Sequence, residues 1–269
     1  MRDLAVELLV KPGTKVRLDK IDPSNTHGKQ KAAAEAQLTK NLDRLSILQY
    51  RLYAESRRSL LIVLQGIDAG GKDGTIRHVM SGFNPQGANV TSFKVPAGDE
   101  KLHDYMWRVH KAVPKFGDIG IFNRSHYEDV LVVRVHNLVP PAVWKKRYDQ
   151  INNFEQMLAD NGVNIVKFFL YIDRDEQKRR FEARLEDAAK NWKFSPSDVE
   201  ERKFWDNYTR AFEEAIERCS KANAPWYIIP ANRKWFRNLA VSEILVHTLE
   251  EMKLKYPKPP SDMPKIQFE

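Results

Sequence analysis

The sequence predicts an α/β fold, in which a doubly wound parallel sheet of about five strands is covered by helices. Short apolar runs alternate with helical patterns along the whole chain, which is typical of strand–helix–strand units with right-handed crossovers. The first run is apolar throughout rather than at every second residue, as a strand buried on both faces of a parallel sheet requires. No repeat or linker interrupts the alternation, so we expect one principal domain over residues 30–255.

The apolar runs and helical patterns give each element an expected place. We expect strands at residues 60–64, 88–93, 118–122, 164–172 and 226–229. Helical patterns cover residues 30–56, 74–80, 100–111, 141–160, 175–190, 197–222 and 234–254. Residues 1–29 are polar and rich in turn formers, and we interpret them as an arm that lies over the domain. Residues 256–269 contain several prolines and are predicted to form an extended tail.

Composition excludes several classes of protein. Of the 269 residues, 42% are apolar, which is enough to build a core and excludes global disorder. The single cysteine, Cys219, excludes an intrachain disulfide and a cysteine-rich metal cluster. The apolar runs are far shorter than the roughly 20 residues that span a bilayer, and no secretory signal is recognisable, so we expect a soluble, cytoplasmic protein. The net charge of +8 indicates an anionic partner.

A glycine-rich loop follows the first predicted strand directly. Residues 66–75 read GIDAGGKDGT, which contains the G-x-x-x-x-G-K spacing of a P-loop. Glycines let successive backbone N–H groups point at one phosphate, and the following helix adds its positive end. The alternative is a glycine-rich turn with a surface lysine. The predicted phosphate-binding residues are Gly66, Ala69, Gly70, Gly71, Lys72, Asp73, Gly74 and Thr75.

One position departs from the P-loop signature. The residue after Lys72 is Asp73 rather than Ser or Thr, so the usual hydroxyl ligand for Mg²⁺ is missing. Because Mg²⁺ prefers hard oxygen ligands and keeps several waters, Asp68 inside the loop is a candidate to hold the metal instead.

A second polar cluster follows the third predicted strand, where residues 123–129 read NRSHYED. Ligands of doubly wound sheets bind beyond the carboxyl ends of the strands, so this cluster lies near the P-loop if the two strands are neighbours. Arg124 is a candidate for bidentate phosphate contact. Glu128 is either a functional carboxylate or an ordinary first-turn acid of a helix. His126 is weighed as a general base, with a packed, hydrogen-bonding role favoured.

Residues 174–196 are predicted to form a basic, helical lid. Arg180 and Arg184 lie four residues apart, hence on one helical face, where they can close over a phosphoryl group together with Lys193. The alternative is a solvated face on which acidic residues balance the basic ones. We interpret Asp173 as the cap of this helix rather than as a metal ligand. Asp198 lies in the first turn of the next predicted helix.

Together these residues resemble the second family of polyphosphate kinases, which are P-loop phosphotransferases that use inorganic polyphosphate and nucleotides. Three motifs in order carry the resemblance: GIDAGGKDGT (66–75), NRSHYED (123–129) and RLEDAAKNWKFSPSD (184–198), with Pro225-Trp226, Lys234 and Arg237 in support. The resemblance implies a P-loop kinase-like fold. It also implies catalytic roles for Asp68, Lys72, Arg124, Glu128 and Arg184, and metal ligands at Asp68, Glu128 and Asp198.

Glu128 refines this resemblance. Many family members read DRSWYN where residues 123–128 here read NRSHYE, and the glutamate is similar to that of the third class, whose members phosphorylate both AMP and ADP. The implied reaction moves the terminal phosphoryl group of polyphosphate to AMP and ADP, giving ADP and ATP, reversibly and with Mg²⁺ or Mn²⁺. The implied partners are polyphosphate, adenine nucleotides and further copies of the chain in a dimer or tetramer, with no specific nucleic acid and no membrane.

Three other functions fit parts of the sequence. An ATP-dependent nucleoside monophosphate kinase of the thymidylate type also has a P-loop, an Asp-Arg element and a basic lid. The basic pI fits a nucleic-acid-binding protein, although no nucleic-acid-binding motif is recognisable. Asp73 and Asn123 fit a pseudo-kinase without activity.

Overall fold

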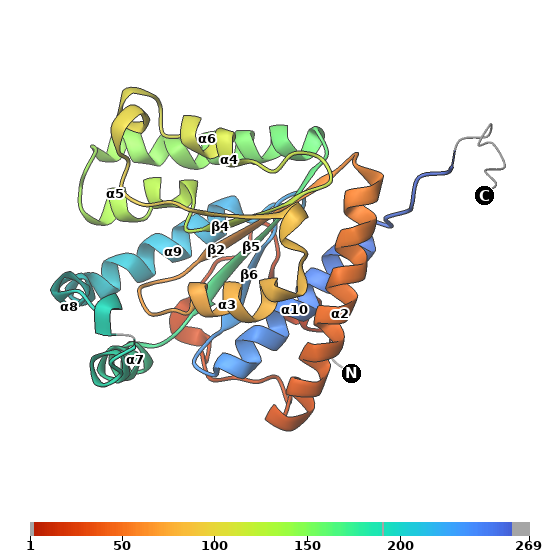
Figure 1. The fold of residues 1–269 in the computed structure, drawn as a ribbon. Helices are drawn as coiled ribbons and strands as arrows, with labels where there is room; N and C mark the ends of the chain where they lie inside the picture. The colour runs from red at the N-terminus through yellow and green to blue at the C-terminus, as the bar shows by residue number, and fades with distance from the viewer. Residues whose placement is uncertain (1–2, 190, 260–269) are drawn as a thin grey trace.

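The structure, a computed structural model, describes residues 3–189 and 191–259. Its centre is a six-stranded sheet in the order β1-β6-β5-β2-β4-β3 (Figure 1). All neighbouring strands are parallel except β1 and β6, so the predicted α/β class is confirmed. The strands are β1 Leu9–Val10, β2 Ser59–Gln65, β3 Ala88–Ser92, β4 Ile119–Asn123, β5 Val163–Tyr171 and β6 Trp226–Pro230.

Helices cover both faces of the sheet (Figure 1). Side chains of α1, α2, α3 and α10 form one core with the sheet, and those of α4, α5, α6 and α9 form the other. The helices are α1 Leu4–Glu7, α2 Lys31–Glu55, α3 Lys72–Val79, α4 Trp107–Ala112, α5 Val132–Val135, α6 Pro141–Asp160, α7 Arg174–Glu186, α8 Pro196–Glu201, α9 Trp205–Cys219 and α10 Lys234–Glu251. Short 3₁₀ turns are η1 Leu18–Lys20, η2 Met80–Gly82, η3 Pro85–Gly87, η4 Gly98–Leu102, η5 His126–Asp129, η6 Asn191–Lys193 and η7 Arg202–Phe204.

The strand β2 lies at the centre of the sheet and is buried over its full length. It pairs in parallel with β4 on one side and β5 on the other, and Leu64 lies opposite Asn123. The continuous apolar run therefore has the meaning expected of a strand with helices on both faces. Each of the five predicted strands is present, with boundaries within one residue of those expected.

The N-terminal segment differs from its prediction as an overlying arm, because part of it is a sixth strand. Leu9 pairs antiparallel with Tyr227 at the edge of the sheet, and Leu4 of α1 is fully buried. A strand of two residues is too short to show an alternating pattern, so the sequence did not reveal it.

Two predicted helices are broken in the structure. The segment 100–111 divides into η4 and α4, because the Oδ1 atom of Asp104 accepts a hydrogen bond from the backbone N–H of Met106 and forms a local turn. The segment 197–222 divides into α8, η7 and α9. The short elements η5 and α5, which follow β4, were not predicted.

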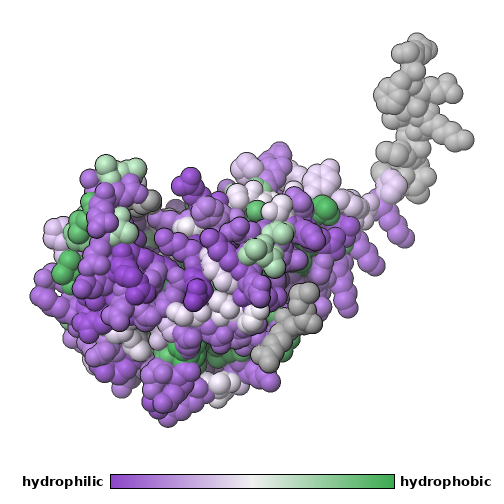
Figure 2. Space-filling model, turned by 90° about the horizontal axis from the view of Figure 1, so that it is seen from below, coloured by the Kyte–Doolittle hydropathy of each residue, from purple (hydrophilic) through white to green (hydrophobic). Residues whose placement is uncertain are grey.

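The outer surface is mainly polar. On the face that Figure 2 shows, hydrophilic residues predominate and hydrophobic residues form small patches, in keeping with apolar side chains gathered in the two cores. Within the described residues, no helix has both the length and the apolar character that crossing a membrane requires.

Cys219, the last residue of α9, belongs to the core formed with α6. Its side chain has no exposed surface, and burial raises the pKa of its thiol to about 12. The thiol therefore stays protonated at neutral pH.

Gly120 in β4 offers a test of packing. A Cβ atom there would lie 2.8 Å from the Cδ atom of Pro114, so we expect Gly120→Ala to lower the free energy of unfolding by about 1–3 kcal/mol. Urea denaturation followed by circular dichroism measures this change. The control is Val90→Ala on the neighbouring strand β3, where the half-exposed side chain predicts a small loss. Equal losses in the two variants would contradict the close contact.

Candidate functional site

The glycine loop, defined here as residues 66–75, connects the end of β2 to the first turn of α3. A Cβ atom at Gly66 would lie 2.9 Å from the carbonyl oxygen of Leu170 on β5, so only glycine fits there without a shift. Gly71 has φ +107°, and Ala69 has φ 62°, so the loop turns through left-handed backbone at both positions. This path brings the loop to the N-terminus of α3, where backbone N–H groups favour an anion.

Lys72 begins α3 and is buried. Its Nζ atom donates to the carbonyl oxygen of Gly66 at 2.6 Å and to that of Ile67 at 3.3 Å. Burial, with the charge of Arg124, lowers its pKa to about 8. The negative charges of Asp68, Glu128 and Asp73 act in the opposite direction and only partly offset this shift. A bound anion would stabilise the ammonium group further.

Arg124 lies at the carboxyl end of β4, beside the glycine loop, because β2 and β4 pair in parallel. Its Nη2 atom lies 2.7 Å from Oδ1 of Asp68, and its Nη1 atom lies 3.4 Å from Oε2 of Glu128. Its φ of 62° places a non-glycine residue in the left-handed region, a conformation that often marks functional sites. The structure thus brings together three of the predicted catalytic residues.

Asp73 and Asn123, the two residues that depart from the expected motifs, contact each other in the structure. Nδ2 of Asn123 donates to Oδ1 of Asp73 at 3.0 Å, although the two residues are 50 positions apart. An acid at position 123 would instead face the carboxylate of Asp73 and repel it. The amide of Asn123 is therefore a compatible hydrogen-bond donor for the carboxylate of Asp73.

Thr75 and Gly74, also in the glycine loop, make contacts within the protein. The hydroxyl of Thr75 is fully buried and donates to the carbonyl oxygen of Gly71 at 3.2 Å. A Cβ atom at Gly74 would lie 3.0 Å from Nη2 of Arg237, a buried residue of α10. Burial and the neighbouring charge of Arg180 lower the pKa of Arg237 to about 10.

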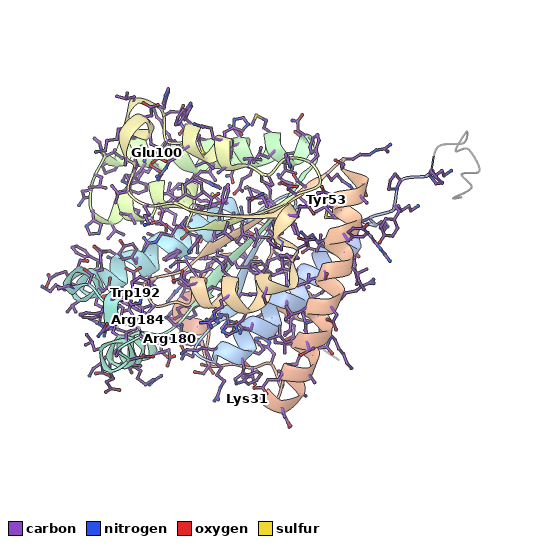
Figure 3. All side chains as sticks on the ribbon, viewed as in Figure 1. Lys31, Tyr53, Glu100, Arg180, Arg184 and Trp192 are labelled. Atoms are coloured by element: carbon purple, nitrogen blue, oxygen red, sulfur yellow. The ribbon has the colours of Figure 1, made fainter. Side chains whose placement is uncertain are left out.

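The two lid arginines have different surroundings, although both project from α7 (Figure 3). Arg180 is buried, and its guanidinium donates to Oε1 of Glu176 and to the carbonyl oxygens of Ala69, Gly70, Ala231 and Asn232. These bonds occupy its N–H donors, so Arg180 contacts the backbone of the glycine loop, and its predicted contact with phosphate stays a prediction. Arg184 is partly exposed, with Nη1 3.9 Å from Oδ2 of Asp198. The side chain of Lys193 lies outside the part of the chain that the structure describes.

Side chains cap the N-termini of both α7 and α8. Oδ1 of Asp173 accepts from the backbone N–H of Glu176 at 2.6 Å, so the cap interpretation of Asp173 is confirmed. Ser195 caps α8 and forms a capping box with Asp198. The pKa of Asp198 is raised above its usual value, mainly by burial and also by the negative charge of Asp68.

The acidic residues of the site suit a hard metal ion. Asp68, Glu128 and Asp198 offer carboxylate oxygens, the ligand type that Mg²⁺ prefers. Among the described residues, no group of three or more acidic, histidine or cysteine side chains forms a ready metal site. That arrangement fits an ion bound by one or two carboxylates, substrate phosphates and water.

A pocket opens beside the glycine loop and Arg124. Its far wall contains Trp205, Tyr208 and Phe212 of α9, which sequence reasoning missed. Their spacing of three and four residues within a predicted helix was the available signal, and it marks one helical face. The complete lining is Gly66, Ile67, Asp68, Arg124, Glu128, Leu131, Val132, Gln177, Glu201, Arg202, Trp205, Tyr208 and Phe212.

The different surroundings of Arg180 and Arg184 predict different effects on stability. Arg180→Met leaves several buried carbonyl oxygens and Glu176 without their donor, so we expect the free energy of unfolding to fall by about 2–4 kcal/mol. Arg184→Met removes a partly exposed ion pair and should cost less than about 1 kcal/mol. Urea denaturation of both variants measures the difference. If the two variants are equally stable, the buried hydrogen bonds of Arg180 do not stabilise the fold, and a role for Arg180 in substrate binding is favoured.

Comparisons with known proteins agree with this geometry. The family model of polyphosphate kinase 2 matches residues 28–257. The AMP/ADP-polyphosphate phosphotransferase of Meiothermus ruber is 52% identical over 263 residues, covering 97% of this chain and 98% of that protein. The ADP-polyphosphate phosphotransferase of Rhodopseudomonas palustris is 47% identical and covers 82% of this chain and 81% of that protein.

The likeness extends to a solved structure. The crystal structure of polyphosphate kinase 2 from Arthrobacter aurescens TC1 superposes with a TM-score of 0.93 at 42% identity, covering 97% of this chain and 94% of that one. The match spans nearly the whole of both chains. The chain therefore belongs to the polyphosphate kinase 2 family and is an enzyme.

Proposed function

We propose that this enzyme transfers the terminal phosphoryl group of inorganic polyphosphate to AMP and to ADP, giving ADP and ATP in a reversible reaction. The observation that carries the proposal is the meeting of Lys72, Arg124 and two carboxylates at the end of β2 and β4. The relative from Meiothermus ruber is named for AMP, ADP and polyphosphate, and the one from Rhodopseudomonas palustris for ADP and polyphosphate, which supports the choice of polyphosphate and adenine nucleotides.

The chemistry asks mainly for charge and alignment. Donor and acceptor are both polyanions, so their mutual repulsion must be offset while the acceptor oxygen lies in line with the transferred phosphorus. Lys72 and Arg124 offset that charge at the glycine loop, and Arg184 adds a cation from the lid. The acceptor oxygen is already anionic, so no strong general base is needed. This agrees with the burial of His126 and its contact with Glu155.

A divalent metal ion is generally needed in this family. We propose Mg²⁺, which Mn²⁺ can replace, held by oxygens of Asp68 and Glu128 with Asp198 nearby. When bound, the ion neutralises charge on the phosphoryl oxygens. Arg124 pairs with both Asp68 and Glu128 and so offsets the repulsion between these two carboxylates.

The wider setting follows the same proposal. We infer that the domain spans residues 30–255, that residues 174–196 act as a lid over the transferred group, and that the backbone of the glycine loop contacts phosphate. We also propose a cytoplasmic homo-oligomer, a dimer or tetramer, that binds no specific nucleic acid and no membrane. Light scattering measures the oligomeric state.

The decisive experiment supplies Mg²⁺, AMP and long-chain polyphosphate without ATP. We expect ADP and then ATP to form, which anion-exchange chromatography resolves. An ATP-dependent monophosphate kinase forms neither, because it has no donor. A pseudo-kinase or a nucleic-acid-binding protein is likewise inactive, so absence of product would end the polyphosphate proposal.

Lys72→Met is the matched variant for that assay. The methionine keeps the length of the buried stem but removes the charge, and we expect transfer to fall by about 10²–10³-fold. Circular dichroism should be unchanged. The exposed Lys101→Met serves as the control and should keep parental activity. If Lys72→Met keeps the parental activity, the glycine loop does not take part in the reaction as proposed.

Glu128→Asn tests the choice of acceptor. The shorter, neutral amide releases Arg124 from one of its two carboxylates. AMP has one phosphate fewer than ADP and depends more on the position of this arginine. We expect kcat/KM for AMP to fall about tenfold relative to that for ADP, a difference of about 1.4 kcal/mol. Steady-state kinetics with both acceptors measures the ratio. Glu100→Asn, at an ion pair outside the pocket, should leave that ratio unchanged.

A further inference from the structure

A buried ion pair lies behind the turn that carries Glu128. Lys167 of β5 has no exposed surface, and Glu155 of α6 is 1% exposed. Nζ of Lys167 lies 2.5 Å from Oε2 of Glu155 and also donates, at 2.8 Å, to the hydroxyl of Tyr127 and to the carbonyl oxygen of Cys219. Taking two charges out of water costs several kcal/mol each, so a pair at this depth needs an explanation beyond stability.

The second carboxylate oxygen of Glu155 serves the turn η5. Oε1 accepts from the hydroxyl of Tyr127 at 2.9 Å and lies 3.1 Å from Nε2 of His126. Both side chains are buried, and Nδ1 of His126 has no partner among the described residues. One carboxylate thus fastens two consecutive residues of η5, and the lysine neutralises that carboxylate.

Ser125 and Asp129, at the two ends of this turn, accept hydrogen bonds from β2 and α6. The Oγ atom of Ser125 accepts from Nε2 of Gln65 on β2 at 3.1 Å. Asp129 accepts from Nη1 of Arg147 on α6 at 2.8 Å. The neighbouring side chains of Arg124 and Glu128 are the ones that line the pocket. The position of these two therefore depends on contacts made behind them.

We propose that the Lys167–Glu155 pair is a positioning device for the acceptor side of the site. It holds η5 so that Glu128 stays against Arg124 at the mouth of the pocket. An apolar pair could not do this, because the Tyr127 hydroxyl and the His126 ring need a buried acceptor, and that acceptor needs a counter-charge. The link to acceptor binding rests on the proposed function, whereas the holding of η5 does not.

Two variants and one control test the proposal. Glu155→Gln removes the charge but keeps the shape. The double variant Lys167→Met with Glu155→Met removes both charges, so it leaves no unpaired ion and keeps the core filled. The control is Asn41→Ala, which removes a buried hydrogen bond to Ser242 between α2 and α10.

Hydrogen exchange and kinetics are the readouts. We expect backbone amides of residues 126–131 to exchange at least about tenfold faster in both variants, while those of α2 keep the parental rate. The KM for AMP should rise about tenfold, and the KM for polyphosphate should stay unchanged. Asn41→Ala should change neither the exchange of residues 126–131 nor the KM for AMP.

A double-mutant cycle with Glu128→Gln completes the design. If the pair acts through Glu128, the loss of kcat/KM for AMP caused by Glu128→Gln should be at least about threefold smaller in the Glu155→Gln background. A loss of the same size would indicate a merely structural effect and overturn the proposal.

The outcomes separate this proposal from the proposed function. Unchanged exchange at residues 126–131 in a folded variant overturns the positioning role. Faster exchange with an unchanged KM for AMP overturns the link to the acceptor. If the parent enzyme transfers nothing from polyphosphate while exchange still responds to Glu155→Gln, the proposed function fails and the holding of η5 stands.

Discussion

The parallel pairing of β2 with β4 is the constraint on which the candidate site depends. It places Leu64 opposite Asn123, so the glycine loop and the polar cluster leave the sheet at the same edge. The backbone N–H of Arg124 donates to the carbonyl oxygen of Leu64 at 3.1 Å and continues the pairing by one residue. From that point the guanidinium of Arg124 reaches Asp68 in the loop. Without this register the motifs would be separate features of the surface.

Two of the cations around the glycine loop, Lys72 and Arg237, donate their hydrogen bonds to neutral groups. Lys72 is bonded to backbone carbonyl oxygens, and Arg237 donates to the side-chain oxygen of Asn238. Burial lowers the pKa of both side chains, which means that their charged forms are incompletely stabilised by the protein. A phosphate chain, the ligand that we propose for this loop, would supply further negative charge. The loop is therefore prepared for an anion before one binds, which spares the cost of reorganisation.

The sequence predicted what is local and missed what depends on contacts across the fold. A continuous apolar run located β2 closely, because burial on both faces removes polar residues from a strand. Shorter apolar runs located β3 to β6 to within one residue. Helical spacing placed Arg180 and Arg184 on one face, but it could not tell which lies against the loop. The contact between Asp73 and Asn123 joins two residues that looked like separate anomalies. Lys167 lies within an apolar run, and no neighbouring residue in the sequence indicates that its partner is Glu155 on α6.

The burial of Cys219 has a practical consequence for experiments that label α7, the helix of the proposed lid. Thiol reagents need an accessible thiolate, and this single cysteine offers neither exposure nor a low pKa. A second cysteine introduced on the surface of α7 can therefore carry a fluorophore or spin label selectively, with the natural sequence as an unlabelled background. Distances from such a probe would report whether α7 moves relative to the sheet in solution, while the core that contains Cys219 stays intact.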